Sequence, residues 1–266
     1  AAVTAHWKGH QINIIDTPGH IDFTAEVERS LRVLDGAVVV FDGKMGVEAQ
    51  SETVWRQATK YGVPRICFVN KINQIGGDFY KSLDSIHKRL SKNAVAIHLP
   101  IGFEKDICGV VDLVDMKAYT YKDYADHELT VGEIPADMVE KAKNARAMLV
   151  EEAVAADEAL MEKFFMEEPF TAEELAKGIK DGIKQRAITP VFCGCAMSGL
   201  GTVQLMKNLI KYAPSPLEGK PAVIVDEDGK ESEMALAPSG SPMAFVFNTM
   251  ADQYGKNSYF KVISGD

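Results

Sequence analysis

Runs of apolar residues alternate with amphipathic helical patterns along this chain, and this alternation constrains the fold more than any other feature. The runs read as strands buried on both faces, because they are continuous and are bounded by turn residues such as Asp35-Gly36. Strands of this kind joined by helices form a parallel sheet, so the sequence predicts an α/β domain with flanking helices. Strands are expected at 11–15, 37–41, 64–69 and 188–192, and helices at 23–34, 50–61, 79–90 and 203–210.

The alternation is interrupted after Asn93 by short extended runs at 95–101, 107–113 and 118–121, without helices between them. A long helical pattern follows over 135–165, which we expect to break near Ala156 or Asp157. A second helix begins at Thr171, with Glu174 at the capping-box spacing. We therefore expect an α+β insert at 94–187 within an α/β domain made of 1–93 and 188–213.

The last part of the chain, 217–266, follows the helix-breaking Pro214-Ser215-Pro216 and has three strand-like runs, at 222–225, 243–248 and 259–264. Three strands make a poor closed sheet. We therefore expect the start of a β-barrel domain that is cut at Asp266.

Composition excludes several classes of protein. The formal net charge of −9 opposes nonspecific binding to a phosphate backbone, and no run approaches the roughly 18–20 apolar residues of a membrane-spanning helix. The N-terminus lacks the pattern of a signal peptide, and the four cysteines follow no disulfide framework. We expect a cytoplasmic protein with reduced thiols and no membrane partner.

Three polar loops follow expected strands at their C-terminal ends, where open α/β sheets bind ligands. An Asp in the first loop can hold Mg²⁺ through water, and its Gly lets a backbone N–H approach a γ-phosphate. The second loop can contact a base and a neighbouring loop, and the third can offer N–H groups to a guanine oxygen. The loops are Asp16-Thr17-Pro18-Gly19-His20, Asn70-Lys71-Ile72-Asn73 and Gly194-Cys195-Ala196. Their order makes the set more specific than each alone, so it predicts GTP or GDP with Mg²⁺.

The chain resembles the elongation factor G family of translational GTPases. The likeness is densest in the Asp-Thr-Pro-Gly-His-Ile-Asp-Phe run at 16–23 and continues through the insert. It is carried by 16–23, 26–30, 33–37, 50–58, 134–139, 161–163 and 212–216. The resemblance implies a Ras-like P-loop GTPase core.

The same resemblance implies that the complete protein is a monomeric GTPase. It would act at the GTPase centre of the large ribosomal subunit and move tRNA and mRNA. His20 would position the water that attacks the γ-phosphate. The acidic run at 151–158 in the insert reads as a solvated face, and the alternative that the resemblance implies is a docking surface for a basic ribosomal stalk protein. Two alternatives are another ribosomal GTPase, such as a ribosome-protection protein or a peptide-release factor, and a non-catalytic fragment.

Two departures from the family pattern affect nucleotide binding. Asn73 stands where the family has Asp, and its amide offers one acceptor oxygen and an NH₂ group that cannot accept. Cys195 stands where the family usually has Ser. In addition, no G-x-x-x-x-G-K-[ST] pattern precedes Asp16, so we expect an internal fragment without the P-loop and the first switch.

Overall fold

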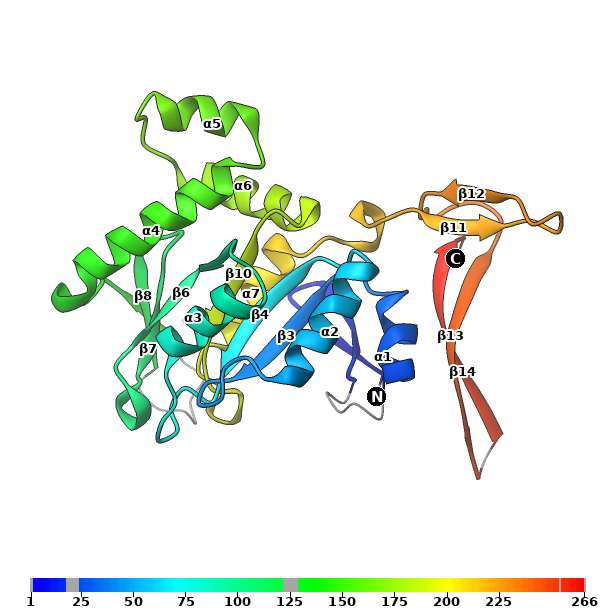
Figure 1. Cartoon of the computed structure of the whole chain (residues 1–266), viewed down its shortest axis with the longest axis horizontal. Helices are drawn as coiled ribbons and strands as arrows, with labels where there is room; N and C mark the ends of the chain where they lie inside the picture. The colour runs from blue at the N-terminus through cyan, green and yellow to red at the C-terminus, as the bar shows by residue number, and fades with distance from the viewer. Residues whose placement is uncertain (1, 18–23, 122–128, 254, 266) are drawn as a thin grey trace. The chain divides into compact units, whose positions relative to one another are not determined.

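The structure is a computed structural model that describes residues 2–17, 24–121, 129–253 and 255–265 (Figure 1). The chain forms two compact units. One consists of 36–55 and 64–213, and the other of 1–35, 56–63 and 214–266. The helix α2 (Ala49–Lys60) has residues in both units.

A parallel sheet forms the centre of the unit made of 36–55 and 64–213. Its strands lie in the order β3-β4-β10-β5. Their bounds are Ala37–Asp42 for β3, Arg65–Asn70 for β4, Thr189–Cys193 for β10 and Ala94–Ala96 for β5. The helices α3 (Phe79–Arg89) and α7 (Thr202–Tyr212) belong to the same unit. The predicted α/β fold with a parallel sheet is confirmed for these strands.

The insert contains an antiparallel sheet in the order β6-β7-β8-β9. The strand bounds are His98–Ile101, Gly109–Asp112, Lys117–Tyr121 and Leu129–Gly132. The two sheets join at Ile97, whose N–H donates to Val191 O at 2.9 Å and whose carbonyl accepts from Leu113 N at 2.9 Å. The predicted boundary at 94 differs from the observed pairing, because β5 pairs in parallel with β10. The extended run expected at 95–101 is in fact two strands, β5 and β6, which belong to different sheets.

Three helices complete the insert: α4 (Val139–Val154), α5 (Glu158–Phe165) and α6 (Ala172–Gln185). The predicted break in the long helix is confirmed, since Asp157 caps α5 by accepting from the N–H groups of Ala159 and Leu160. The predicted capping box of Thr171 and Glu174 is also present at the start of α6. Short 3₁₀ helices lie at Glu104–Asp106, Ala136–Met138, Ala196–Ser198 and Pro216–Glu218.

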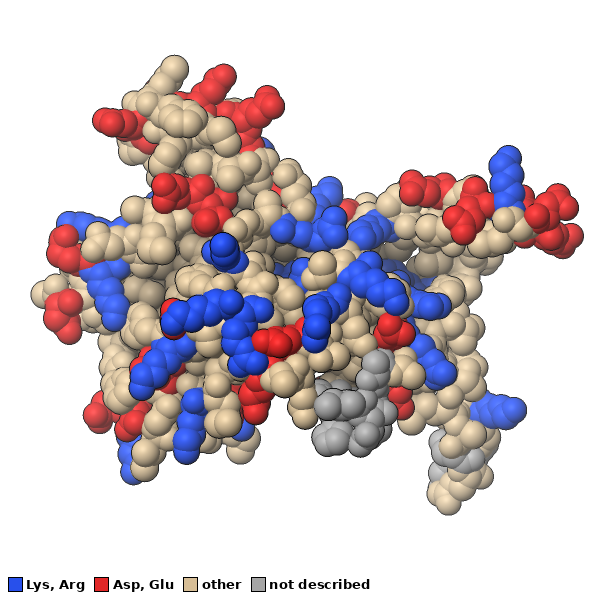
Figure 2. All heavy atoms as spheres, viewed as in Figure 1, with Lys and Arg blue, Asp and Glu red and all other residues tan. Residues whose placement is uncertain are grey.

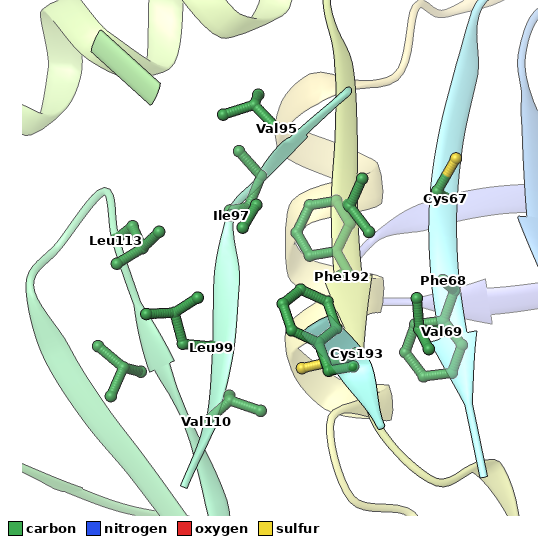
Figure 3. Packing of buried hydrophobic residues seen from close by; sticks show 14 of the residues in the cluster. Cys67, Phe68, Val69, Val95, Ile97, Leu99, Val110, Leu113, Phe192 and Cys193 are labelled. Carbon is green, nitrogen blue, oxygen red and sulfur yellow. The ribbon is translucent and has the colours of Figure 1, made fainter. Parts of the chain in front are cut away.

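The core of this unit lies around β10. Figure 3 shows Phe192 and Cys193 of β10 between side chains of β4 and side chains of β6 and β7. Phe192, Cys193, Cys67 and Val110 are all buried. Burial raises the pKa of the Cys67 thiol to about 12, so this group stays protonated and unreactive at neutral pH. The packing joins the insert and the parallel sheet in one hydrophobic core.

The other unit contains three antiparallel hairpins and the helix α1 (Thr24–Leu31). The predicted strand at 11–15 is β2, and it pairs with β1 rather than with the parallel sheet. The hairpins are β1 (Ala2–Trp7) with β2 (His10–Ile15), β11 (Ala222–Val225) with β12 (Glu231–Met234), and β13 (Met243–Asp252) with β14 (Gly255–Ser264). The three predicted C-terminal strands are present, and β12 adds a fourth. That they begin a β-barrel stays a prediction. No helix among the described residues is long and apolar enough to cross a membrane.

A buried carboxylate, Asp112, ends β7 in the antiparallel sheet and lies opposite His98 of β6. Its Oδ2 is 3.4 Å from Nε2 of His98, and its Oδ1 accepts from Val114 N at 2.8 Å and Asp115 N at 3.1 Å. Burial alone would raise the pKa of Asp112, but the hydrogen bonds from His98 and the two backbone N–H groups together hold it below its ordinary value. The ionised form of Asp112 therefore stabilises the fold.

Replacing Asp112 with Asn should destabilise β6 and β7 at pH 7 by about 1–3 kcal/mol, because the buried hydrogen-bond partners lose their carboxylate. The folded pKa lies below the unfolded pKa of about 3.9, so the carboxylate's contribution is complete above that value and is lost as the pH falls through the folded pKa. Amide hydrogen exchange of β6 and β7 should therefore show a difference between the variant and the wild type that shrinks below about pH 4. Asp106→Asn, at an exposed position, is the control. If hydrogen exchange differed between the variant and the wild type by the same amount at pH 7 and below about pH 4, the prediction would be contradicted.

Candidate functional site

The carboxyl ends of β3, β4 and β10 lie at one edge of the parallel sheet. Asp42 at the end of β3 pairs in register with Asn70 at the end of β4, and Cys193 at the end of β10 pairs with Val69. The loops that follow these strands therefore leave the sheet side by side. The second and third loops predicted from the sequence meet here.

Asn70 joins these two loops through one side-chain oxygen. Its Oδ1 accepts from the N–H of Lys71 at 2.8 Å and from the N–H of Ala196 at 2.9 Å. The two loops also contact each other through their backbones, since Ile72 N–H donates to Gly194 O at 3.5 Å. Asn70 therefore fixes the position of the third loop relative to the second.

Lys71 is held in a left-handed backbone conformation, with φ of 60°, and its ammonium pairs with Asp42. Nζ of Lys71 lies 2.8 Å from Oδ2 of Asp42, while Oδ1 of Asp42 accepts from Lys44 N at 2.9 Å. The hydrogen bond from Lys71 lowers the pKa of Asp42 against the opposing effect of burial. The pair holds the lysine side chain across the edge of the sheet. Asp42 was missed from the sequence, although it ends an apolar strand just as Asp16 does.

Asn73, the last residue of the second loop, carries a buried acceptor. Its Oδ1 is buried and has no hydrogen-bond partner among the described residues, while its neighbour Ile72 is fully buried in the core. A buried carbonyl oxygen without a partner costs about 1–3 kcal/mol, so such an atom in a native structure needs an explanation. A ligand N–H group that donates to Asn73 would supply one.

The third loop is closed on itself. Cys195 N–H donates to Leu200 O at 2.9 Å, and a side chain at Gly194 would collide with the carbonyl of Leu200 and the ring of Phe68. Gly194, Cys195 and Ala196 each donate their N–H to an acceptor within the protein: Val69 O, Leu200 O and Asn70 Oδ1. A guanine oxygen would share one of these donors, so the predicted contact stays a prediction. Cys195 is buried, so its side chain is not exposed to a ligand.

A sequence model described as the elongation factor Tu GTP binding domain matches residues 1–215. The chain belongs to this family. It is 46% identical over all 266 residues to proteins named elongation factor G from Ureaplasma urealyticum serovar 10 and Ureaplasma parvum serovar 3. The chain spans 39% of the length of these relatives. A solved structure from Thermus thermophilus matches with a TM-score of 0.82 at 27% identity, covering 99% of this chain and 37% of that one.

The likeness to elongation factor G that the sequence predicts is confirmed by these relatives, and membership of the GTP-binding family agrees with the sheet edge described above. The first predicted loop is described only in part. Asp16 is exposed after the end of β2 and Thr17 is half-buried, and both belong to the unit that does not contain the parallel sheet. Pro18, Gly19 and His20 lie outside the described residues. Their roles at the γ-phosphate and the attacking water stay predictions.

Metal binding in this GTP-binding family member rests on the sequence alone. Among the residues that the structure describes, no group of three or more His, Cys, Asp or Glu side chains could hold a metal ion. The predicted Mg²⁺ contact uses one carboxylate, Asp16, through water, and phosphate oxygens as the other ligands. Such a contact would not form a cluster of protein ligands.

Proposed function

We propose that this chain carries the guanine-recognition loops of a GTPase that acts on the ribosome, as part of a protein similar to elongation factor G. The observation that carries the proposal is the edge where Asn70 joins two loops beside the buried, unpaired Oδ1 of Asn73. This edge would offer the unpaired acceptor of Asn73 to a planar base, beside two loops that Asn70 holds together. Membership of the GTP-binding family makes guanine the expected base.

The residues present fit a purine base with a 1-NH group. Asn73 Oδ1 would accept from that N–H, and the ion pair of Lys71 with Asp42 would hold the lysine stem over one face of the base. The backbone of Gly194, Cys195 and Ala196 would lie near the 6-oxo oxygen. Each contact uses an atom at the same edge of the sheet.

The phosphate end of the nucleotide would be bound by the first loop. Mg²⁺, when bound through water to Asp16, would neutralise charge on the phosphate oxygens. Thr17, Pro18 and Gly19 would bring backbone groups to the γ-phosphate, and His20 would orient the attacking water. Phosphoryl transfer depends mostly on positioning and charge stabilisation, so one oriented water is a sufficient role for this side chain.

The partner we propose is the ribosome, approached at the GTPase centre of its large subunit. A basic stalk protein would dock on the insert, and tRNA and mRNA would be moved indirectly by a monomeric protein in the cytoplasm. The support is the acidic surface over α5 that is visible in Figure 2, since α5 carries Glu158 and Glu162. Opposite charge would steer a basic partner to this surface.

The test is GTP hydrolysis by the complete gene product, with and without ribosomes. We expect turnover that depends on Mg²⁺ and rises strongly when ribosomes are added, followed by movement of mRNA by one codon. Release of peptide or of a bound antibiotic without codon movement would favour another ribosomal GTPase. Absence of turnover in all conditions would favour the non-catalytic alternative, which the Asn73 substitution supports.

A further inference from the structure

We propose that Tyr121 is a positioning residue for guanine recognition: its hydroxyl, which comes from the insert, holds the far end of the loop that faces the base. The inference rests on the proposed function, because it concerns the same nucleotide site. It assigns to the insert a part in base selection. Tyr121 is the last residue of β8, and the loop that it holds spans 194–201.

The hydroxyl of Tyr121 makes two hydrogen bonds. It accepts from Gly201 N–H at 3.1 Å and donates to Oε1 of Gln204 at 2.7 Å. Tyr121 is 9% exposed and Gln204 is 2% exposed, so water does not readily replace either bond. The hydroxyl therefore has both a donor and an acceptor partner, and both lie at the start of α7.

Gly201 transmits this contact to the loop. It has φ of +77°, and a side chain there would collide with the carbonyl of Cys193, while Gly194 Cα would lie 3.1 Å away. The backbone at Gly201 is thus packed directly on the first residues of the loop. Any shift of Gly201 must move Gly194 as well, because protein interiors have no room to absorb it.

The loop has two supports that lie at opposite ends. Asn70 Oδ1 holds Ala196 from the side of β4, and the Tyr121 hydroxyl holds Gly201 from the side of the insert. Between them, Cys195 N–H donates to Leu200 O and closes the loop. Without the Tyr121 hydroxyl the buried N–H of Gly201 would lose its acceptor, which favours a rearranged loop.

A neighbouring tyrosine on the same strand provides a matched control. Tyr119 also lies against α7, with Lys207 Nζ 5.5 Å from its ring centroid, but its hydroxyl donates to Asp115 at 3.2 Å. Tyr119→Phe and Tyr121→Phe therefore remove the same atom from the same strand. Only the second substitution removes a hydrogen bond to the loop.

The experiment compares dissociation constants for GDP and 6-thioguanosine diphosphate in the complete gene product. The analogue keeps the 1-NH group and replaces the 6-oxo oxygen with sulfur, a weaker acceptor. We expect Tyr121→Phe to weaken GDP binding by about three- to tenfold and analogue binding by less than about twofold. Tyr119→Phe should leave both constants unchanged. The base-dependent difference is a readout that general destabilisation would not produce.

A second variant keeps the test decisive if Tyr121→Phe folds poorly. Gln204→Met removes only the acceptor of the Tyr121 hydroxyl, and Nε2 of Gln204 has no hydrogen-bond partner among the described residues to lose. It should give the same base-dependent pattern with a smaller amplitude.

Three results would overturn the inference, and they differ from one another. Equal weakening of both nucleotides by Tyr121→Phe would make Tyr121 a structural residue only. If Tyr121→Phe left both dissociation constants unchanged, as expected for Tyr119→Phe, Tyr121 would have no role at the nucleotide site. If the wild type binds neither nucleotide, the proposed function itself fails, and the inference fails with it.

Discussion

Replacing Asn73 with Asp shifts the preference of the protein from xanthine toward guanine nucleotides, by about a hundredfold in the ratio of the two dissociation constants. The present amide offers one acceptor oxygen, which is buried and unpaired, and an NH₂ group that can only donate. Guanine presents two donors on this edge, its 1-NH and its 2-amino group. Against these two donors Asn73 sets one acceptor oxygen and one NH₂ group, and the NH₂ group repels the donor that it meets.

Xanthine carries a carbonyl in place of the 2-amino group, so it accepts from the Asn73 NH₂ while its 1-NH donates to Oδ1. A carboxylate at position 73 reverses the preference for the two bases. It accepts two hydrogen bonds from guanine, and it repels the xanthine carbonyl. Each change is worth about 1–3 kcal/mol, so their sum appears as a large change in the ratio.

Titration of GDP and xanthosine diphosphate into the wild type and the Asn73→Asp variant measures the shift. Asn93→Asp introduces the same charge beside Ala187, which precedes β10 at the opposite edge of the sheet, and should leave the ratio unchanged. An unaltered ratio in Asn73→Asp would show that this side chain does not read the base.

Replacing Asn70 with Ala should weaken binding of the preferred nucleotide by roughly a hundredfold. The substitution leaves the N–H groups of Lys71 and Ala196 without their shared acceptor and releases the third loop from the second. The variant loses the contact of the Asn70 side chain with the base, and the two loops are no longer held in position. The affinity should therefore fall by more than the loss of one hydrogen bond.

Asn93→Ala is the matched control for this loss. It removes the hydrogen bond from Asn93 Nδ2 to Ala187 O, at 2.9 Å, which lies away from the nucleotide edge. Both variants can be compared by thermal unfolding without nucleotide and by nucleotide titration. Similar affinities for the two variants would mean that the Asn70 bridge is not needed for binding.

The central sheet could be predicted because its strands are continuous apolar runs with sharp polar ends. The same pattern indicated which loops carry the site. The expectation that the strand at 37–41 is buried on both faces was wrong, because Val38 and Val40 of β3 are exposed. The break in the long helix was expected near Ala156 or Asp157, and the structure explains it by the capping of α5 by Asp157. The strand β12 could not be predicted, since it is short, polar and exposed. Likewise, β1 and β9 carry no continuous apolar run.

The contacts that fix the site could not be derived from pattern alone. Ala196 and Asn70 are 126 residues apart, and Gly201 and Tyr121 are 80 apart. The first hydrogen bond depends on the pairing of β4 with β10, and the second on how the insert packs at the start of α7. Neither arrangement leaves a periodic signal in the sequence. Tyr121 therefore read only as part of a strand.

One titration tests the central claim that this sheet edge recognises a guanine-type base. GDP, xanthosine diphosphate and ADP should each be titrated in Mg²⁺ into the complete gene product, with dissociation constants measured by calorimetry. The account predicts binding of both GDP and xanthosine diphosphate, with the xanthine nucleotide bound relatively well for a member of this family, and no measurable binding of ADP. Equal binding of ADP, or binding of none of the three, would contradict it.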